Sequence, residues 1–438
     1  MSLQYNGRKT MILLSALFCS VPFAVAQKYH PEEPHHHAFH SQEHVAEVAE
    51  HEATMREALE NNTPVDFQMP GTSRFAFAGR DNKFYLSIGG YAKATASYDF
   101  GNPLDNPNEF ITSQIPTVSS PGNGGLIQFS AMQTHLCLNF LALPHTADQV
   151  GVFVGANFLN DYAPVLQFAY IKYRGFEAGY DYSVFSDPAA LPPTIDYEGP
   201  NASSAIQTTL LSYTRPFGKK KEWKVGVGAE LPVYSVTPGD NAASVRQRVP
   251  DIPAFLQYSW GEGASWVRLS GIVRNLLYRD DLLEKNFNKV GWGVQLSGMA
   301  AVGPGLTAFY QALYGRGIAS HIQDLSDCGL DMTPASAEGR MSLVPAWGGF
   351  LGLQYDFSRK VSASMTYSHV RTYADRYDGG ETVWGDQYRY AQYAVANLFW
   401  NVTDIVKTGI EYIYGRRVNY DGSQGHDNRV QAMIQVNF

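Results

Sequence analysis

The side chains best suited to chemistry in this sequence are cations spread along apolar, alternating segments. They are Lys93, Lys172, Arg268, Arg274 and Arg389. Arg268 and Arg274 have the same parity, so on one strand they point to the same face. A basic ladder of this kind would suit carboxylates or phosphates, because a guanidinium offers a rigid fork of donors. A structural role, in which these arginines pair with acidic loop residues, is the alternative.

Acidic residues that could oppose these cations lie in one predicted loop, residues 186–204. They are Asp187, Asp196 and Glu198. Facing cations across a channel, they would create a fixed field that favours some ions over others. Alternatively, they fix the loop to a surrounding wall through salt bridges. The sequence leaves both roles open.

No pattern typical of an enzyme accompanies these charges. The histidines beyond residue 130 are scattered, and no serine lies in a Gly-x-Ser-x-Gly elbow. We therefore predict a protein that is not an enzyme and has no cofactor and no metal in its channel. With a net charge of −8, it is not predicted to bind nucleic acid.

The segments that carry the cations alternate between apolar and polar residues. The last one ends with Val430, Ala432, Ile434 and Phe438 on one face and glutamines on the other. Another, at 405–418, sets Lys407 and Glu411 opposite apolar residues. A charge on a lipid-facing position near mid-bilayer costs about 2–4 kcal/mol. The polar face is therefore predicted to line an aqueous lumen.

Sixteen such strands are predicted after Phe75, with short and longer connections in alternation. They are Lys83–Ser97, Leu126–Ala142, Gln149–Phe158, Val165–Arg174, Phe176–Phe185, Ala205–Arg215, Trp223–Leu231, Ile252–Trp260, Ser265–Tyr278, Lys289–Val302, Leu306–Ile318, Leu343–Phe357, Val361–Tyr373, Gln387–Asn401, Ile405–Val418 and Asp427–Phe438. The alternation predicts an all-β fold, a 16-stranded antiparallel transmembrane barrel with both ends on one side. A soluble sandwich does not explain it.

Residues 1–26 are predicted to be a signal peptide for export. Arg8 and Lys9 precede an apolar run, and Ala24-Val25-Ala26 forms a small-residue cleavage site. The run is too short to be a spanning helix. Lipidation at Cys19 is disfavoured by the bulky Phe18 before it.

Residues 27–74 are predicted to form a periplasmic segment, followed by the barrel at 75–438. The segment holds seven of the 12 histidines and is rich in Glu. A helix is predicted over 41–61, with a weak coiled-coil seam at Val45, Val48, Glu52, Met55 and Leu59. So short a helix needs partners, such as copies of itself. A solvated tail and metal capture by the histidines are the alternatives.

Association of several copies is also suggested by small residues on the first strand. Gly90, Ala92, Ala94 and Ala96 share one face and are poor lipid contacts. A homotrimer is the resulting hypothesis. Cys137 and Cys328 are predicted to be unpaired, although a disulfide between them remains possible.

Several motifs resemble the DcaP-like porins, over roughly residues 75–438. They are Gly179–Pro188, Leu191–Asn201, Gly89–Lys93, Ala396–Trp400, Gly409–Tyr412 and Tyr414–Arg417. The resemblance implies a trimeric sixteen-stranded porin with a periplasmic coiled coil, passing small and often anionic solutes. It also implies that loop 186–204 folds inward and narrows the pore. Where the family tends to carry Arg in the second strand, this chain has His135 nearby, which is mostly neutral at pH 7.

The predicted function is passive diffusion of small hydrophilic, anionic or dicarboxylate-like solutes through the outer membrane of a Gram-negative bacterium. The predicted partners are the lipid bilayer, small solutes and two further copies of the chain. A phosphate-selective porin is one alternative, and a non-conducting adhesin or structural anchor is another. A TonB-type transporter is disfavoured, because the segment at 27–64 is too short to form a plug.

Overall fold

The computed structural model describes residues 52–64, 75–79, 81–118, 124–335, 338–374 and 386–438. The predicted signal peptide, most of the predicted periplasmic segment and most of the loop 374–386 lie outside the described residues. Among the residues described, no helix is long and apolar enough to cross a membrane.

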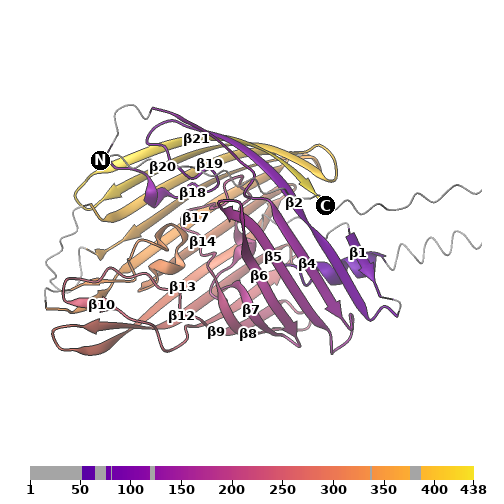
Figure 1. Cartoon of the computed structure of the whole chain (residues 1–438). Coiled ribbons are helices and arrows are strands. Elements are labelled where there is room, and N and C mark those ends of the chain that lie inside the picture. The colour runs from indigo at the N-terminus through magenta and orange to yellow at the C-terminus, as the bar shows by residue number, and fades with distance from the viewer. Residues whose placement is uncertain (1–51, 65–74, 80, 119–123, 336–337, 375–385) are drawn as a thin grey trace, which may run out of the picture. The chain divides into compact units, whose positions relative to one another are not determined.

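Within the described residues, the chain closes into the predicted barrel of sixteen antiparallel strands (Figure 1). β3 and β4 count as one interrupted strand. The barrel strands are β2 (Phe84–Asp99), β3 (Leu126–Ser130), β4 (His135–Ala142), β5 (Val150–Asn160), β6 (Ala163–Tyr173), β7 (Phe176–Tyr182), β8 (Gln207–Phe217), β9 (Trp223–Glu230), β11 (Ile252–Trp260), β12 (Ser265–Asp280), β13 (Lys285–Gly303), β14 (Leu306–Arg316), β17 (Pro345–Asp356), β18 (Val361–Thr372), β19 (Tyr388–Asn401), β20 (Val406–Asn419) and β21 (Gln424–Asn437).

The last strand closes the barrel on the first. β21 pairs with β2 from Arg429 to Asn437, and the two lie side by side in Figure 1. The backbone amide of Phe438 donates to the Gly90 carbonyl at 3.1 Å, and the Gly90 amide donates back at 3.2 Å. Beyond this point β1 (Phe75–Ala78) continues the pairing with β2. The last strand of the chain therefore completes the closed barrel.

Alternation along the strands separates an outer face from the lumen, as predicted. On β20, Ile410 and Tyr412 are exposed, whereas Glu411 is buried. The exposed apolar positions form the surface that contacts lipid. Lys407 faces inward too, since its Nζ lies 4.1 Å from the ring centre of the buried Phe399.

The two ends of the barrel differ in their connections. Seven connections, at 143–149, 174–175, 218–222, 261–264, 304–305, 357–360 and 402–405, define the short-turn end. The opposite, long-loop end carries five long segments: L1 (100–125), L3 (183–206), L4 (231–251), L6 (317–344) and L7 (373–387). At this end, the predicted strands on either side of 159–164 and 279–288 extend further than expected and meet in tight turns at 161–162 and 281–284.

The predicted continuous strand Leu126–Ala142 is interrupted at residues 131–134. Ser130 pairs with Thr95 and His135 with Tyr91. The interrupted strand β3–β4 therefore carries one residue more than β2 over this stretch. The Thr134 amide closes a turn on the Ala131 carbonyl at 3.1 Å. Such a bulge redirects side chains and cannot be read from alternation.

Short elements decorate this frame and escaped prediction because each has only a few residues. They are β10 (Ala242–Ser244), β15 (Met332–Pro334), β16 (Met341–Leu343), η1 (Thr112–Gln114), η2 (Pro188–Ala190), η3 (Ala319–His321) and η4 (Gln323–Leu325). Residues 52–60 form a helix, which lies within the helix predicted over 41–61. Cys137 and Cys328 are free thiols, as favoured.

Candidate functional site: the lumen

The first part of L3 is fixed to the lumen wall by a carboxylate and an arginine. Asp187 Oδ2 accepts hydrogen bonds from Trp266 Nε1 at 3.1 Å and Ser297 Oγ at 2.7 Å. Arg268 Nη1 lies 3.9 Å from Asp187 Oδ1, and its Nη2 donates to the Val184 carbonyl. The sequence left open whether Asp187 faces a cation across the channel or fixes the loop to the wall. In the structure, Asp187 and Arg268 together fix L3 to the wall.

Arg274 holds two other loops. Its Nε donates to Asp251 Oδ2 of L4 at 2.9 Å, and its Nη1 donates to Asp331 Oδ1 of L6 at 3.2 Å. Nη1 also donates to the Gly317 carbonyl at 2.7 Å, and Nη2 to that of Val233. Arg268 and Arg274 share the lumenal face, as predicted. Both are engaged by loops, which is the structural role that the sequence left open.

The middle of L3 is held by Glu411 of β20. Its carboxylate accepts hydrogen bonds from the backbone amides of Ile195 at 2.8 Å and Asp196 at 3.0 Å. Asn397 Nδ2 and Gln431 Nε2 donate to the same carboxylate at 3.0 and 2.8 Å. L3 therefore lies inside the barrel, and the inward fold implied by the resemblance is confirmed.

Asp196 connects L3 to L1 and to the wall. Its Oδ1 accepts a hydrogen bond from the Phe110 amide, and its Oδ2 accepts one from the Tyr393 hydroxyl, both at 2.9 Å. Burial, with the neighbouring Glu411 charge, raises the pKa of Asp196 from an ordinary 3.8 to about 7. At neutral pH this carboxyl is therefore partly protonated.

Glu198 lies where L1, L3 and L6 meet. Its Oε2 accepts a hydrogen bond from Gln323 Nε2 at 2.9 Å, whereas Oε1 has no partner among the described residues. Burial, with Glu109 and other acids nearby, raises the pKa of Glu198 well above its usual value. Burial likewise raises the pKa of Asp324 in L6. Burial therefore favours the neutral form of each of these carboxyls.

Lys93 and His135 lie on adjoining strands but differ in their surroundings. Lys93 Nζ donates to the Ile195 carbonyl of L3 at 3.2 Å. The His135 ring stacks on Tyr91 at 5.8 Å between centres and meets Phe168 edge-on at 6.4 Å. His135 is 2% exposed, so it is packed in the wall.

Lys172 and Arg389 lie at opposite ends of the barrel. Lys172, near the short-turn end, has its Nζ 3.5 Å from Glu177 Oε2 and 4.2 Å from the Tyr170 ring centre. Arg389 lies at a bulge at the start of β19, 5.9 Å from the Tyr420 ring centre. The predicted cations are therefore spread along the lumen and do not form one cluster.

Residues 52–64 enter the short-turn end, which the sequence reasoning missed. Met55 and Leu59, two positions of the predicted seam, are buried against Tyr85 and Leu141 of the barrel. The seam positions Val45 and Val48 lie outside the described residues. The helix thus finds at least part of its partner surface in its own barrel.

Buried amides lock this segment in place. Asn62 Nδ2 donates to Asn139 Oδ1 at 2.7 Å, and Asn139 Nδ2 donates back to the Leu59 carbonyl at 2.8 Å. The Tyr170 hydroxyl donates to the Asn62 carbonyl at 2.7 Å. A side chain at Gly151 would meet Asn62, since its Cβ would lie 2.1 Å from Oδ1. The sequence signal that could have indicated this contact was Asn139, a polar residue on the inward face of its strand.

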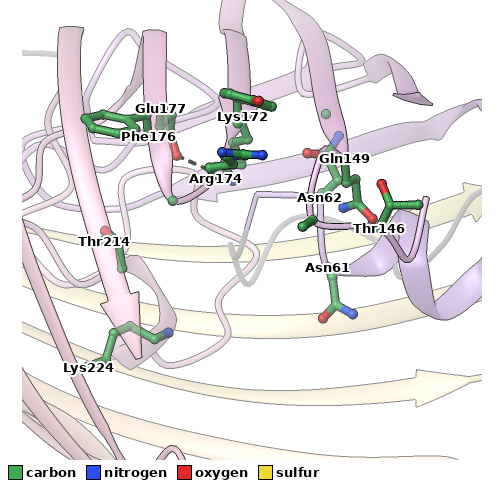
Figure 2. Close-up of a pocket in the computed structure, with 14 residues that line it drawn as sticks. Asn61, Asn62, Thr146, Gln149, Lys172, Arg174, Phe176, Glu177, Thr214 and Lys224 are labelled. Carbon is green, nitrogen blue, oxygen red and sulfur yellow. Dashed lines mark ion pairs between the residues drawn. The ribbon is translucent and has the colours of Figure 1, made fainter. Parts of the chain in front are cut away.

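A cavity of 540 Å³ remains between this segment and the wall (Figure 2). Asn61 and Asn62 line one side and Lys224 lies across from them, while Lys172, the second lumenal lysine, lies apart from Lys224 and also lines the cavity. Lys224 was missed as a candidate, although alternation with Gly226, Gly228 and Glu230 places it inward. We call this cavity the mouth pocket.

A family model described as the porin subfamily matches residues 142–437. This chain belongs to the porin subfamily. No curated protein is significantly similar to it in sequence. The porin's barrel places it in the outer membrane, where it acts as a channel protein.

Solved structures support the same fold. The outer membrane channel DcaP of Acinetobacter baumannii matches with a TM-score of 0.70 and 20% identity, over 83% of this chain and 100% of that chain. An anion-selective porin from Comamonas acidovorans matches with a TM-score of 0.53 and 9% identity, over 81% and 100%. The predicted resemblance to DcaP-like porins is confirmed at the level of the fold.

Proposed function

We propose that this porin is a passive channel for small hydrophilic solutes and that it prefers small anions such as dicarboxylates. The observation that carries the preference is the state of the lumenal charges. Lys224 and Lys407 face the lumen and have no carboxylate partner among the described residues. Meanwhile burial raises the pKa of Asp196 to about 7 and raises that of Glu198 as well, which favours the neutral forms of both carboxyls. A solute in the lumen therefore meets a net positive electrostatic potential, which favours anions.

The orientation follows from the connections. Outer-membrane barrels have short periplasmic turns and longer extracellular loops. We therefore propose that the short-turn end, which residues 52–64 enter, faces the periplasm, and that the segment 27–74 is periplasmic. The outer entrance is then lined by L1, L3, L4 and L6. Solutes leave at the periplasmic end, past residues 52–64.

A homotrimer is supported by the outer surface of β2. Ala92 and Ala94 are exposed on the lipid-facing side, and Ala96 lies opposite Ala432 of β21. This stretch offers little apolar area to lipid, whereas small residues let protomers approach closely. A monomeric mass by light scattering in mild detergent would contradict this part of the proposal.

The test is single-channel recording of the purified protein in a planar bilayer under a salt gradient. We expect openings in steps of three and a reversal potential that indicates anion preference. A cation preference would retain the channel and reject the role of the lysines. A folded barrel without conductance would favour an adhesin or structural anchor, in which the contacts among L1, L3 and L6 would serve to close the lumen. Preference for inorganic phosphate over malonate would favour the phosphate-selective alternative.

A further inference from the structure

The mouth pocket has a wall from each of two distant parts of the chain. Residues 61–62 follow the N-terminal helix, whereas residues 146–151, 172–177, 214 and 224 belong to the barrel. In Figure 2 the Asn61 and Asn62 side chains lie across the opening from Lys224 and Thr214. The cavity therefore exists only because the N-terminal segment enters the barrel.

Positive charge dominates the part of this pocket that remains available. Lys172 is offset by Glu177, with 3.5 Å between Nζ and Oε2. Arg174 also lines the pocket, but its charge is paired with Asp148, with 2.5 Å between Nη2 and Oδ1. Lys224 has no ion pair among the described residues; the charges of Arg268 and Lys172 oppose its own, and that of Asp187 offsets them in part. An incoming anion would relieve that repulsion.

Neutral donors complete the surroundings of Lys224 and Lys172. The side-chain amides of Asn61 and Gln149 and the hydroxyl of Thr214 line the pocket. None of these donor groups has a hydrogen-bond acceptor recorded among the described residues. Two ammonium groups with amide and hydroxyl donors match a ligand that has several acceptor oxygens and a negative charge.

We propose that the mouth pocket is a binding site for a small oxyanion, of carboxylate or phosphate chemistry. The site rests on the proposed function, in which such solutes leave the channel at the short-turn end. Its volume admits a small dianion with some of its water. A retained hydration shell keeps binding weak, which suits a channel because a tightly held solute would block it.

The rigid wall is as important as the charge. Asn62 is fixed by its bonds to Asn139 and Tyr170, so Asn61 is presented to the pocket without a large loss of conformational freedom. Asn62→Ala would release this wall while leaving both lysines unchanged. It therefore separates the shape of the site from its charge.

The test is calorimetric titration of the full-length protein in detergent with malonate and, separately, with inorganic phosphate. Lys224→Gln is expected to weaken binding about tenfold, as for one solvated charge-assisted hydrogen bond. Asn62→Ala should also weaken it. Lys220→Gln is the matched control, since Lys220 lies in the neighbouring turn at 218–222 and does not line the pocket.

Binding of either probe that Lys224→Gln weakens and Lys220→Gln does not supports the site, and the tighter probe identifies the oxyanion. Equal binding by both variants, or no saturable binding, overturns it. The bilayer recordings separate this result from the proposed function. Conductance with anion preference but without pocket binding leaves the porin standing and removes only the site.

Discussion

The two ends of the lumen hold similar cations in opposite states. At the long-loop end, the Arg274 side chain is 0% exposed and satisfied by Asp251, Asp331 and loop carbonyls. At the short-turn end, the Lys172 side chain is 33% exposed, and Lys224 faces an open pocket. Arg274 serves the fold. Lys172 shares its charge with Glu177, and Lys224 remains available to a solute.

The lengths of the connections explain this difference. L3, L4 and L6 are long enough to turn back into the lumen and bring carboxylates and carbonyls to the arginines. A buried charge is tolerable only with such partners. The turns at 174–175 and 218–222 are too short to reach inward. Among the described residues, only 52–64 enter from that side, and the two that line the mouth pocket, Asn61 and Asn62, bring amides.

Removing the buried cation is the strongest test of this contrast. Arg274→Ala leaves Asp251 and Asp331 buried without their partner, which is expected to cost about 3–5 kcal/mol of unfolding free energy. L4 and L6 should then loosen, with faster proteolysis of both and noisier conductance. The measurement is the intensity of the folded, heat-modifiable band on a gel of unheated samples, followed through a denaturant or thermal series.

Arg279→Ala is the matched control for Arg274→Ala. Arg279 lies on the same strand and pairs with Asp281, but the two side chains are 39% and 48% exposed. The expected loss is at most about 1 kcal/mol. Equal destabilisation by the two variants would contradict the assignment of Arg274 to loop anchoring.

The sequence predicted the frame of the molecule well because lipid imposes a strict period of two. Ile410 and Glu411 could be assigned to opposite faces from spacing alone, and the structure agrees. Spacing also placed Arg268 and Arg274 on the lumenal face. It could not show whether they were free, because their partners lie far away in sequence, such as Asp331. Nor could it place residues 52–64, since their polar contacts with Asn139 follow no period.

A pH change tests the interlocked loops with a smaller effect. The pKa of Asp196 in the docked loop is about 7, above its ordinary 3.8, so the docked state keeps a proton that a released loop loses. Docking of L3 therefore weakens as pH rises from 4 through 7. Glu198 acts in the same direction, since burial raises its pKa as well. We therefore expect closures of the channel, caused by L3 leaving its docked position, to be on the order of tenfold more frequent at pH 8 than at pH 5.

Glu198→Gln sharpens the pH test. The substitution removes one titrating group and keeps an oxygen that can accept from Gln323, while the partnerless Oε1 position can hold the amide nitrogen. Single-channel records of this variant should show a smaller difference between pH 5 and pH 8. Closure rates that are unchanged by pH in the unmodified protein would rule out titration of this loop junction.

The smallest effect is expected from an unpaired cation at the short-turn end. Lys407 is half-buried, rests on the Phe399 ring at 4.1 Å and makes no ion pair among the described residues. Lys407→Gln should leave the unfolding free energy nearly unchanged, because no carboxylate is stranded. It should lower the anion-to-cation permeability ratio by less than about twofold, since salt in the lumen screens a single charge. Reversal potentials at low ionic strength, with Lys360→Gln in the turn at 357–360 as control, measure this change. If Lys407→Gln destabilises the barrel as Arg274→Ala does, the division between structural and available charges fails.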